Sequence, residues 1–133
     1  MLANLRNLAL AEFRAATDGL TGLPNKRAVI ETVKRMAAYA SRSISPLSAI
    51  ALDLDHFKQI NDELSHAVGD EVLRLASERI AAACRPGDTL ARFGGDEFVV
   101  VCENVSVVAA ERLAWGVRDA VCQTFALGEQ AWC

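Results

Sequence analysis

Two apolar runs joined by a pair of glycines constrain the fold of this chain more than any other feature. The segments DTLARF and EFVVVCE flank Gly94-Gly95-Asp96. A tight turn between strands needs residues at positive φ, which glycine adopts without steric cost. Apolar runs on either side of such a turn predict a β-hairpin. The chain therefore builds a sheet and needs helices to cover it.

A further strand is predicted at PLSAIALDLD, residues 46–55. Its apolar residues occupy both faces until Asp53 and Asp55, which is typical of a central strand covered on both sides. Helical spacing predicts helices over residues 1–16, 25–41, 70–84 and 106–124, with a short helix and a turn after residue 55. Strands in this order, mixed with helices, predict an α+β fold with an antiparallel hairpin beside a central strand.

Composition narrows the class of protein. The chain has 133 residues, enough for one domain with a real core. Its net charge of −3 argues against a nucleic-acid groove. No apolar run is long enough for a transmembrane helix, and the N-terminus does not read as a signal peptide. The four cysteines lack a CxxC pair, so we expect reduced thiols in a cytosolic protein, three of them filling the core.

The acids beside the glycines suggest a chemistry. If Asp53 ends a strand next to the hairpin, its carboxylate meets those of Asp96 and Glu97. Such a cluster repels itself unless cations fill it. Oxygen ligands of this kind suit Mg²⁺ beside substrate phosphates, and two such ions can assist phosphoryl transfer. The alternative is a solvated hairpin turn with no ligand, and the residues alone leave both interpretations open.

Three segments in order carry a resemblance: DGLTGLPNKR, LDLDHFKQINDELSHAVGDEVL and RPGDTLARFGGDEFVVV. Over residues 17–124 the chain resembles a GGDEF domain of the diguanylate cyclase family, which joins two GTP molecules into cyclic di-GMP. The resemblance implies a ferredoxin-like, nucleotidyl-cyclase palm, in which helices flank a central sheet containing antiparallel strands. It also implies an N-terminal linker helix over residues 1–16 and a GGDEF domain over residues 17–133.

The resemblance assigns the metal and the catalytic groups. The carboxylates of Asp53, Asp96 and Glu97 and the backbone carbonyl of Leu54 match ligands of Mg²⁺, with Mn²⁺ as a substitute. Asp96 also matches the base that activates the 3′-hydroxyl, and Glu97 is grouped with it as catalytic. Gly94 and Gly95 leave the backbone open to the substrate.

The resemblance also assigns substrate contacts. Asn61 and Asp70 match the pair that reads the guanine, whose edge offers both acceptors and N–H donors. Lys58 would reach the phosphates, and His66 lies in the same segment. Two structural alternatives stand beside these roles, because Asn61 could cap a turn and Asp70 could be the N-cap of the next helix.

Arg85 and Asp88 form an RxxD motif at the offset from GGDEF where the family binds its inhibitory product. Arginine can bind phosphate or stack on guanine, and aspartate can accept from guanine N–H groups. The alternative for Arg85 is a charge at the C-terminus of a helix.

The mechanism that the resemblance implies needs two copies. The 3′-hydroxyl of one GTP attacks the α-phosphorus of the other, so two domains face each other in a homodimer, and an upstream sensory domain would set their geometry. The alternative for residues 1–16 is a frayed end. A competing function is an inactive GGDEF module that senses GTP or cyclic di-GMP. The domain is expected in the cytoplasm, with a parent protein that could be membrane-anchored.

Two departures from the family pattern carry expectations of their own. Ser65 stands where the family has glycine, and it would be strained if the turn there needs positive φ. The family's C-terminal strand and helix are missing after FALGEQAWC, so we expect a truncated chain whose apolar strand from Leu47 keeps an unpaired edge, which a swapped dimer could cover.

Overall fold

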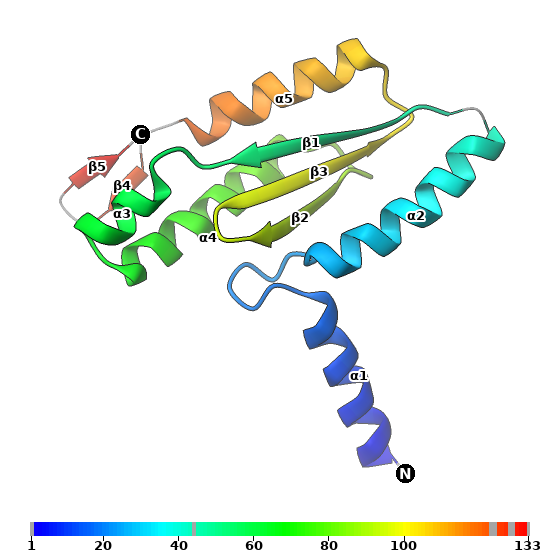
Figure 1. The fold of residues 1–133 in the computed structure, drawn as a ribbon, viewed down its shortest axis with the longest axis horizontal. Helices are drawn as coiled ribbons and strands as arrows, with labels where there is room; N and C mark the ends of the chain where they lie inside the picture. The colour runs from blue at the N-terminus through cyan, green and yellow to red at the C-terminus, as the bar shows by residue number, and fades with distance from the viewer. Residues whose placement is uncertain (1, 44, 123–124, 128–129, 133) are drawn as a thin grey trace.

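The structure, a computed structural model, describes residues 2–43, 45–122, 125–127 and 130–132 and has the predicted α+β architecture (Figure 1). The helices are α1 (Leu2–Ala16), α2 (Lys26–Ser43), α3 (Phe57–Glu63), α4 (His66–Ala83) and α5 (Val107–Val121). The strands are β1 (Leu47–Asp53), β2 (Thr89–Gly94), β3 (Glu97–Glu103), β4 (Phe125–Leu127) and β5 (Gln130–Trp132).

The predicted hairpin is the middle of the molecule. Strands β2 and β3 pair antiparallel, and β1 adds to the other side of β3, so the main sheet has the order β1-β3-β2. Gly94 and Gly95 have φ of 135° and 51°, which is the conformation for which glycine was predicted at the turn. A separate two-stranded sheet consists of β4 and β5.

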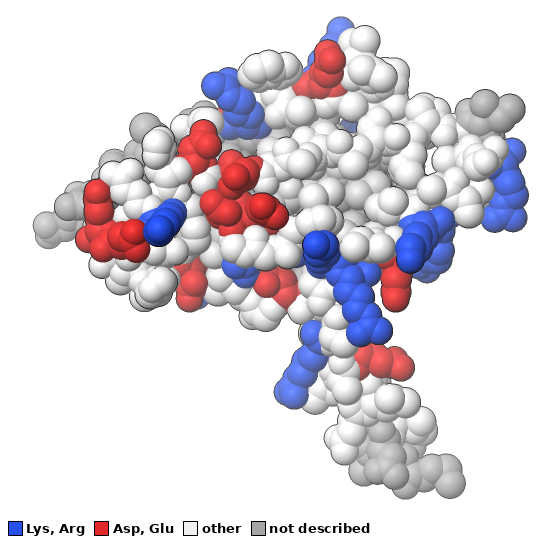
Figure 2. Space-filling model, in the orientation of Figure 1, with Lys and Arg blue, Asp and Glu red and all other residues white. Residues whose placement is uncertain are grey.

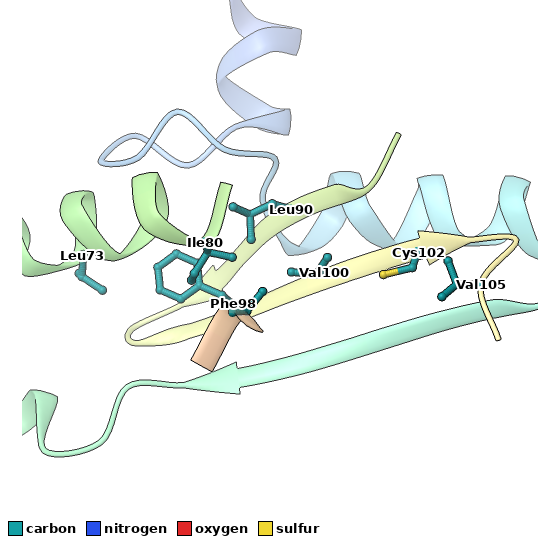
Figure 3. Packing of buried hydrophobic residues seen from close by; sticks show 8 residues of the cluster. Leu73, Ile80, Leu90, Phe98, Val100, Cys102 and Val105 are labelled. Atoms are coloured by element: carbon teal, nitrogen blue, oxygen red, sulfur yellow. The ribbon is translucent and has the colours of Figure 1, made fainter. Parts of the chain in front are cut away.

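Helices cover both faces of the three-stranded sheet, as Figure 1 shows. Alternate residues of β3 point to opposite faces. Phe98, Val100 and Cys102 are fully buried in one cluster with Leu73 and Ile80 of α4, seen in Figure 3. On the other face, buried residues of β2, β3 and α2 form a smaller cluster: Val29, Ala91 and Val101. The structure therefore has three layers, with α4 and α5 on one side and α2 on the other.

The first helix stands apart from this core. Helix α1 projects away from the sheet in Figure 1, and its apolar side chains Leu5, Leu8 and Phe13 are exposed. The helix ends at Ala16, where the linker was predicted to end, although the division into a linker and a domain stays a prediction.

The structure corrects the prediction for β1. We expected a strand covered on both faces, but one face of β1 is exposed. The unpaired edge that we expected from Leu47 is present within the described part of the chain. Ile50 and Leu52 pack against the core, whereas Ala49 and Ala51 on the other face are exposed. The apolar character of alanine led to this error, because a small side chain can lie in water at little cost.

The helix boundaries also correct two alternatives. Helix α4 begins at His66, not at Asp70, and its N-cap is Ser65. Asp70 therefore lies inside the helix and is not its cap. Asn61 lies inside α3, so it does not cap a turn either. The last helix ends at Val121; the end predicted at residue 124 lies outside the described residues.

The cysteines only partly follow the expected pattern. Cys102 is buried, Cys84 is half-buried against the main cluster, and Cys122 is exposed. Cys133 lies outside the described residues. Among the helices that the structure describes, none is both long and apolar enough to cross a membrane.

Candidate functional site

The end of β1 meets the hairpin turn at two acids. Asp53, the last residue of β1, pairs with Glu97 in the sheet register. One residue further, the Leu54 N–H donates a hydrogen bond to the Asp96 carbonyl at 3.2 Å. This geometry places the side chains of Asp53 and Asp96 close enough to interact. Figure 2 shows acidic side chains gathered over this end of the sheet.

The two carboxyls perturb each other. The pKa of Asp53 is raised, first by its hydrogen bond with the Asp96 carboxyl, then by the negative charge of Asp96 and, more weakly, by desolvation and Asp55. The pKa of a carboxyl rises in this way when no positive charge lies near enough to stabilise its ionised form. A divalent cation would supply that charge, and paired carboxylate oxygens are donors that suit Mg²⁺.

The structure brings together two of the three carboxylates that we predicted to form a cluster. Among the described residues, no group of three or more His, Cys, Asp or Glu side chains is placed to hold a metal ion. Asp53 and Asp96 come together, while Glu97 is exposed opposite Asp53. The ligand roles of Glu97 and of the Leu54 carbonyl stay predictions.

The glycine turn lies open beside the acids. No atom lies within 4 Å of the position that a Cβ would take at Gly94 or Gly95. Glycine is thus required there for its positive φ, and the free space on that side leaves the backbone accessible to a ligand.

An arginine that we did not predict holds this turn in place. Arg92 donates to the Gly95 carbonyl from Nη2 at 2.8 Å and from Nε at 3.2 Å. Its Nη1 bonds Asp18 at 2.9 Å, so the loop after α1 is tied to the hairpin. Burial would raise the pKa of Asp18, but hydrogen bonds from Thr21 and Arg92 outweigh it and lower the pKa. Asp18 and Arg92 both lie in the segments that carry the family resemblance, and that resemblance is the signal by which they could have been predicted.

The predicted guanine-reading pair lies where α3 packs on α4. A Cβ on Gly69 would lie 1.8 Å from Oδ1 of Asn61, so only glycine lets α4 approach this amide. Asn61 thus lies beside Gly69, the residue directly before Asp70. Asn61 is half-buried, and its amide makes no hydrogen bond to another described residue, which leaves it available to a ligand.

The other predicted substrate residues are exposed. Lys58 lies on the first turn of α3, and His66 and Asp70 lie one turn apart on α4. Ser65, between the two helices, has φ of −177°, so its place in the family's glycine position brings no strain. Its hydroxyl instead accepts a hydrogen bond from the Val68 N–H at 3.1 Å and caps α4.

The RxxD motif folds onto itself. Asp88 accepts hydrogen bonds from the Arg85 N–H at 2.7 Å and from its Nη2 at 3.1 Å. The Asp88 side chain is 2% exposed and that of Arg85 49%. The carboxylate therefore orients the guanidinium, which faces solvent. Burial of the thiol, with a smaller effect of the Asp88 charge, raises the pKa of Cys84 to about 11.

Comparison with known proteins agrees with this geometry. The family model described as Diguanylate cyclase, GGDEF domain, matches residues 15–126. The chain is 41% identical over 108 residues to the diguanylate cyclase DgcP of Pseudomonas aeruginosa. The alignment covers 81% of this chain and 16% of DgcP, so the chain spans about a sixth of that relative.

Solved structures share the fold. The diguanylate cyclase SiaD of Pseudomonas aeruginosa, crystallised with its activator SiaC, is 31% identical with a TM-score of 0.84, over 98% of this chain and 51% of SiaD. The coiled coil and GGDEF domain of DgcB from Caulobacter crescentus, in complex with c-di-GMP, is 26% identical with a TM-score of 0.86, over 98% of this chain and 69% of that one.

Proposed function

Because the chain belongs to the diguanylate cyclase GGDEF domain family, we propose that it joins two GTP molecules into cyclic di-GMP, releasing two pyrophosphates. The observation that carries the proposal is the paired carboxyls of Asp53 and Asp96 beside an open glycine turn. A self-repelling acidic pair at a surface is unfavourable in the empty protein, and a cation with a phosphate ligand relieves it.

The metal would be Mg²⁺, with Mn²⁺ as a substitute. Asp53 and Asp96 would hold it, joined by Glu97 and the Leu54 carbonyl. When bound, the ion neutralises charge that develops on the phosphate oxygens. The raised pKa of Asp53 is the feature of this chain that favours such an ion.

The chain's own residues would then position the nucleotide. The Asn61 amide and the Asp70 carboxylate would read the guanine edge. Lys58, which is exposed, would reach the phosphates, and the exposed His66 would contact the substrate from the same segment. The 3′-oxygen of one GTP forms a bond to the α-phosphorus of the other, and the bond to pyrophosphate breaks. Asp96, with Glu97 beside it, would accept the proton of the 3′-hydroxyl.

Each half-site would hold one GTP, so catalysis would need two chains facing each other. The exposed apolar residues of α1 would let an upstream helix pair set that geometry, under control of a sensory region. With GTP as its substrate, the domain would work in the cytoplasm, and it would do so equally in a parent protein anchored to a membrane.

The product would regulate the same domain. The DgcB structure contains c-di-GMP. In this chain the half-exposed Arg85 guanidinium, held by the buried Asp88 carboxylate, would bind a phosphate or stack on a guanine of the product. Asp88 would then act by orienting Arg85.

The test is to incubate this chain with GTP and Mg²⁺ and to measure cyclic di-GMP by liquid chromatography. We expect product, its loss in Asp53→Asn and Asp96→Asn, and its retention in Asp62→Asn, an exposed acid of α3 outside the site. If the unmodified chain bound GTP and made no product, the proposed enzyme activity would be refuted and the sensing module would be favoured. Unchanged activity in Asp53→Asn would overturn the assigned site.

A further inference from the structure

The peptide groups on the two sides of Asp96 are each held by hydrogen bonds. On one side the Gly95 carbonyl accepts from Arg92 at 2.8 Å and 3.2 Å. On the other side the Asp96 carbonyl accepts from the Leu54 N–H at 3.2 Å. Each peptide group is planar, so fixing the two planes that meet at the Cα of Asp96 also fixes the direction of its side chain. The backbone therefore directs this carboxylate.

Side-chain packing does not hold the turn itself. No atom lies within 4 Å of the Cβ positions of Gly94 and Gly95, and glycine is the residue with the most backbone freedom. The register between β2 and β3 also shifts between Arg92 and Gly94. A turn with this freedom depends on hydrogen bonds to keep one conformation, and the Arg92 side chain donates two of them.

Asp18 orients the Arg92 side chain. Its Oδ1 accepts a hydrogen bond from Nη1 of Arg92 at 2.9 Å. Its Oδ2 accepts from the Thr21 N–H at 2.8 Å and from the Thr21 hydroxyl at 2.7 Å. Both carboxylate oxygens are thus bonded, which prevents rotation. Because a guanidinium holds its donors in one plane, a carboxylate on one side and a carbonyl on the other fix the orientation of that plane.

The loop that carries Asp18 is itself attached to the hairpin. The Asp18 N–H donates to the Leu23 carbonyl at 2.7 Å, which closes the loop. The Arg92 N–H donates to the Pro24 carbonyl at 3.0 Å, which joins the loop to β2. Figure 1 shows this loop, between α1 and α2, beside the end of the hairpin. Asp18 is therefore a fixed anchor for Arg92.

The burial of the pair indicates that Arg92 acts through the turn. The Arg92 side chain is 13% exposed and that of Asp18 is 18% exposed. The N–H groups of Arg92 that face the turn and the loop already have acceptors. Little of the guanidinium is left for a substrate, so Arg92 is suited to placing another residue.

We propose that Arg92, oriented by Asp18, is a positioning residue for the cyclase reaction, because it holds the Asp96 carboxylate beside Asp53 through the Gly95 carbonyl. This inference rests on the proposed function, in which Asp96 accepts the proton of the 3′-hydroxyl. The loop before α2 thereby acquires a role in the reaction.

The role predicts a specific kinetic signature. The residues that would bind the nucleotide, Lys58 and Asn61, lie on α3 and make no hydrogen bond to this network among the described residues. Loss of the Arg92 contacts should therefore misplace Asp96 and lower kcat, while the KM for GTP changes little.

The first test is Arg92→Lys in the full chain. Lysine keeps the positive charge but cannot donate to the carbonyl and the carboxylate in the geometry of a guanidinium. We expect kcat to fall by about 10- to 100-fold, since small displacements of a reacting group have effects of this size. The control is Arg74→Lys on α4, where the exposed Arg74 pairs with Glu71, and its kcat should be unchanged.

The second variant, Asp18→Asn, keeps the shape of the anchor and removes its charge. It should lower kcat less than Arg92→Lys does, because the bonds to the Gly95 carbonyl can persist. The double variant should be no worse than Arg92→Lys alone, since Asp18 acts only through Arg92. Additive losses would overturn the proposed order of action.

The NMR order parameter of the Asp96 amide measures the positioning without any nucleotide. This N–H belongs to the same peptide group as the Gly95 carbonyl. In the unmodified chain and in Arg74→Lys we expect a value of about 0.85, which is typical of rigid backbone. In Arg92→Lys it should fall toward about 0.6, the value that marks flexible backbone. Circular dichroism should show that both variants stay folded.

An unchanged kcat in Arg92→Lys would overturn the proposal. So would a lower kcat with an unchanged order parameter, because Arg92 would then act on the substrate directly. If Arg92→Lys failed to fold, Asp18→Asn would be judged by the same two measurements. If the unmodified chain made no product, the proposed function would fail, and the order parameter would still decide whether Arg92 holds the turn.

Discussion

At the scale of single residues, Asp53 is a case in which function conflicts with stability. Its carboxyl is exposed, yet its pKa is raised by Asp96. The folded protein therefore binds this proton more tightly than the unfolded chain does, and it loses stability as the pH rises through the folded-state pKa. The negative charge of Asp96 therefore disfavours the ionised form of Asp53 in the folded protein.

We predict that Asp53→Asn raises the melting temperature of the metal-free protein at pH 7 and abolishes cyclase activity. The gain should vanish below about pH 4, near the pKa of a free aspartate, where the carboxyl is protonated in both states. Calorimetry across this pH range measures it. Asp62→Asn is the control and should show no such pH-dependent gain; an equal gain there would refute repulsion by Asp96 as the cause.

Gly69 also affects the site, because it has no side chain. A Cβ there collides with the Asn61 amide, while alanine inside a helix is otherwise preferred to glycine by about 1 kcal/mol. Because the colliding atom is at the end of a side chain, Asn61 can rotate away. We therefore expect Gly69→Ala to fold with an unchanged or higher melting temperature.

The same variant should bind GTP about tenfold more weakly, since one hydrogen bond of about 1.5 kcal/mol is lost. Isothermal titration calorimetry measures the affinity for GTP. Asn61→Ala should match it, and the double variant should be no worse than either, because both changes remove one contact. Additive losses in the double variant would show that Gly69 acts by another route.

At the scale of elements, the hairpin and helix α2 follow from local sequence, because turn and capping residues act within a few positions. Asn25, just before α2, accepts a hydrogen bond from the Ala28 N–H at 3.0 Å and so caps the helix. The start of α4 was mispredicted by four residues. Ser65 was judged only as a substitute for glycine, although a serine before a helical segment is itself an N-cap signal. The Arg92–Asp18 bond joins residues 74 positions apart, and nothing local in the chain indicates it.

The cap on α4 can be tested by comparing two replacements. Ser65→Ala removes the acceptor for the Val68 N–H and should lower the free energy of unfolding by about 1 kcal/mol. Ser65→Gly should cost only a few tenths of a kcal/mol, because glycine is tolerated at N-caps. Urea denaturation distinguishes them. Equal losses would mean that the hydroxyl does not stabilise the helix.

At the scale of the whole molecule, the sequence indicated the three strands of the main sheet and the unpaired edge from Leu47, but not that one face of β1 is exposed. Ala49 and Ala51 are apolar and fit a covered strand as well as an exposed one. Similarly, the pairing of Asp53 with Asp96 depends on the register between β1 and β3. The resemblance to a family predicted that Asp53 and Asp96 lie together. The alternation of apolar residues and the spacing of the motifs were not enough to predict it.

The proposed mechanism makes a prediction about pairs of chains. If each copy holds one GTP, cyclic product requires two competent sites, and a pair containing one Asp53→Asn chain cannot close the ring. After subunit exchange in an equal mixture, random pairing leaves about a quarter of the pairs fully wild type. Cyclic di-GMP production should therefore fall to about a quarter of that of wild-type protein at the same total concentration.

Dilution of wild-type chains with an unrelated carrier protein such as albumin controls for a loss of active chains alone. In that mixture a site contained in one chain and a site shared by two chains both predict about half of the original rate, provided that pairing stays saturated. In the mixture with Asp53→Asn, only a site contained in one chain predicts one half. A rate of one half in the mixture with Asp53→Asn would therefore contradict the two-chain site. The linear dinucleotide should accumulate in the mixed pairs, because one competent site can still donate its α-phosphorus, and chromatography would detect it.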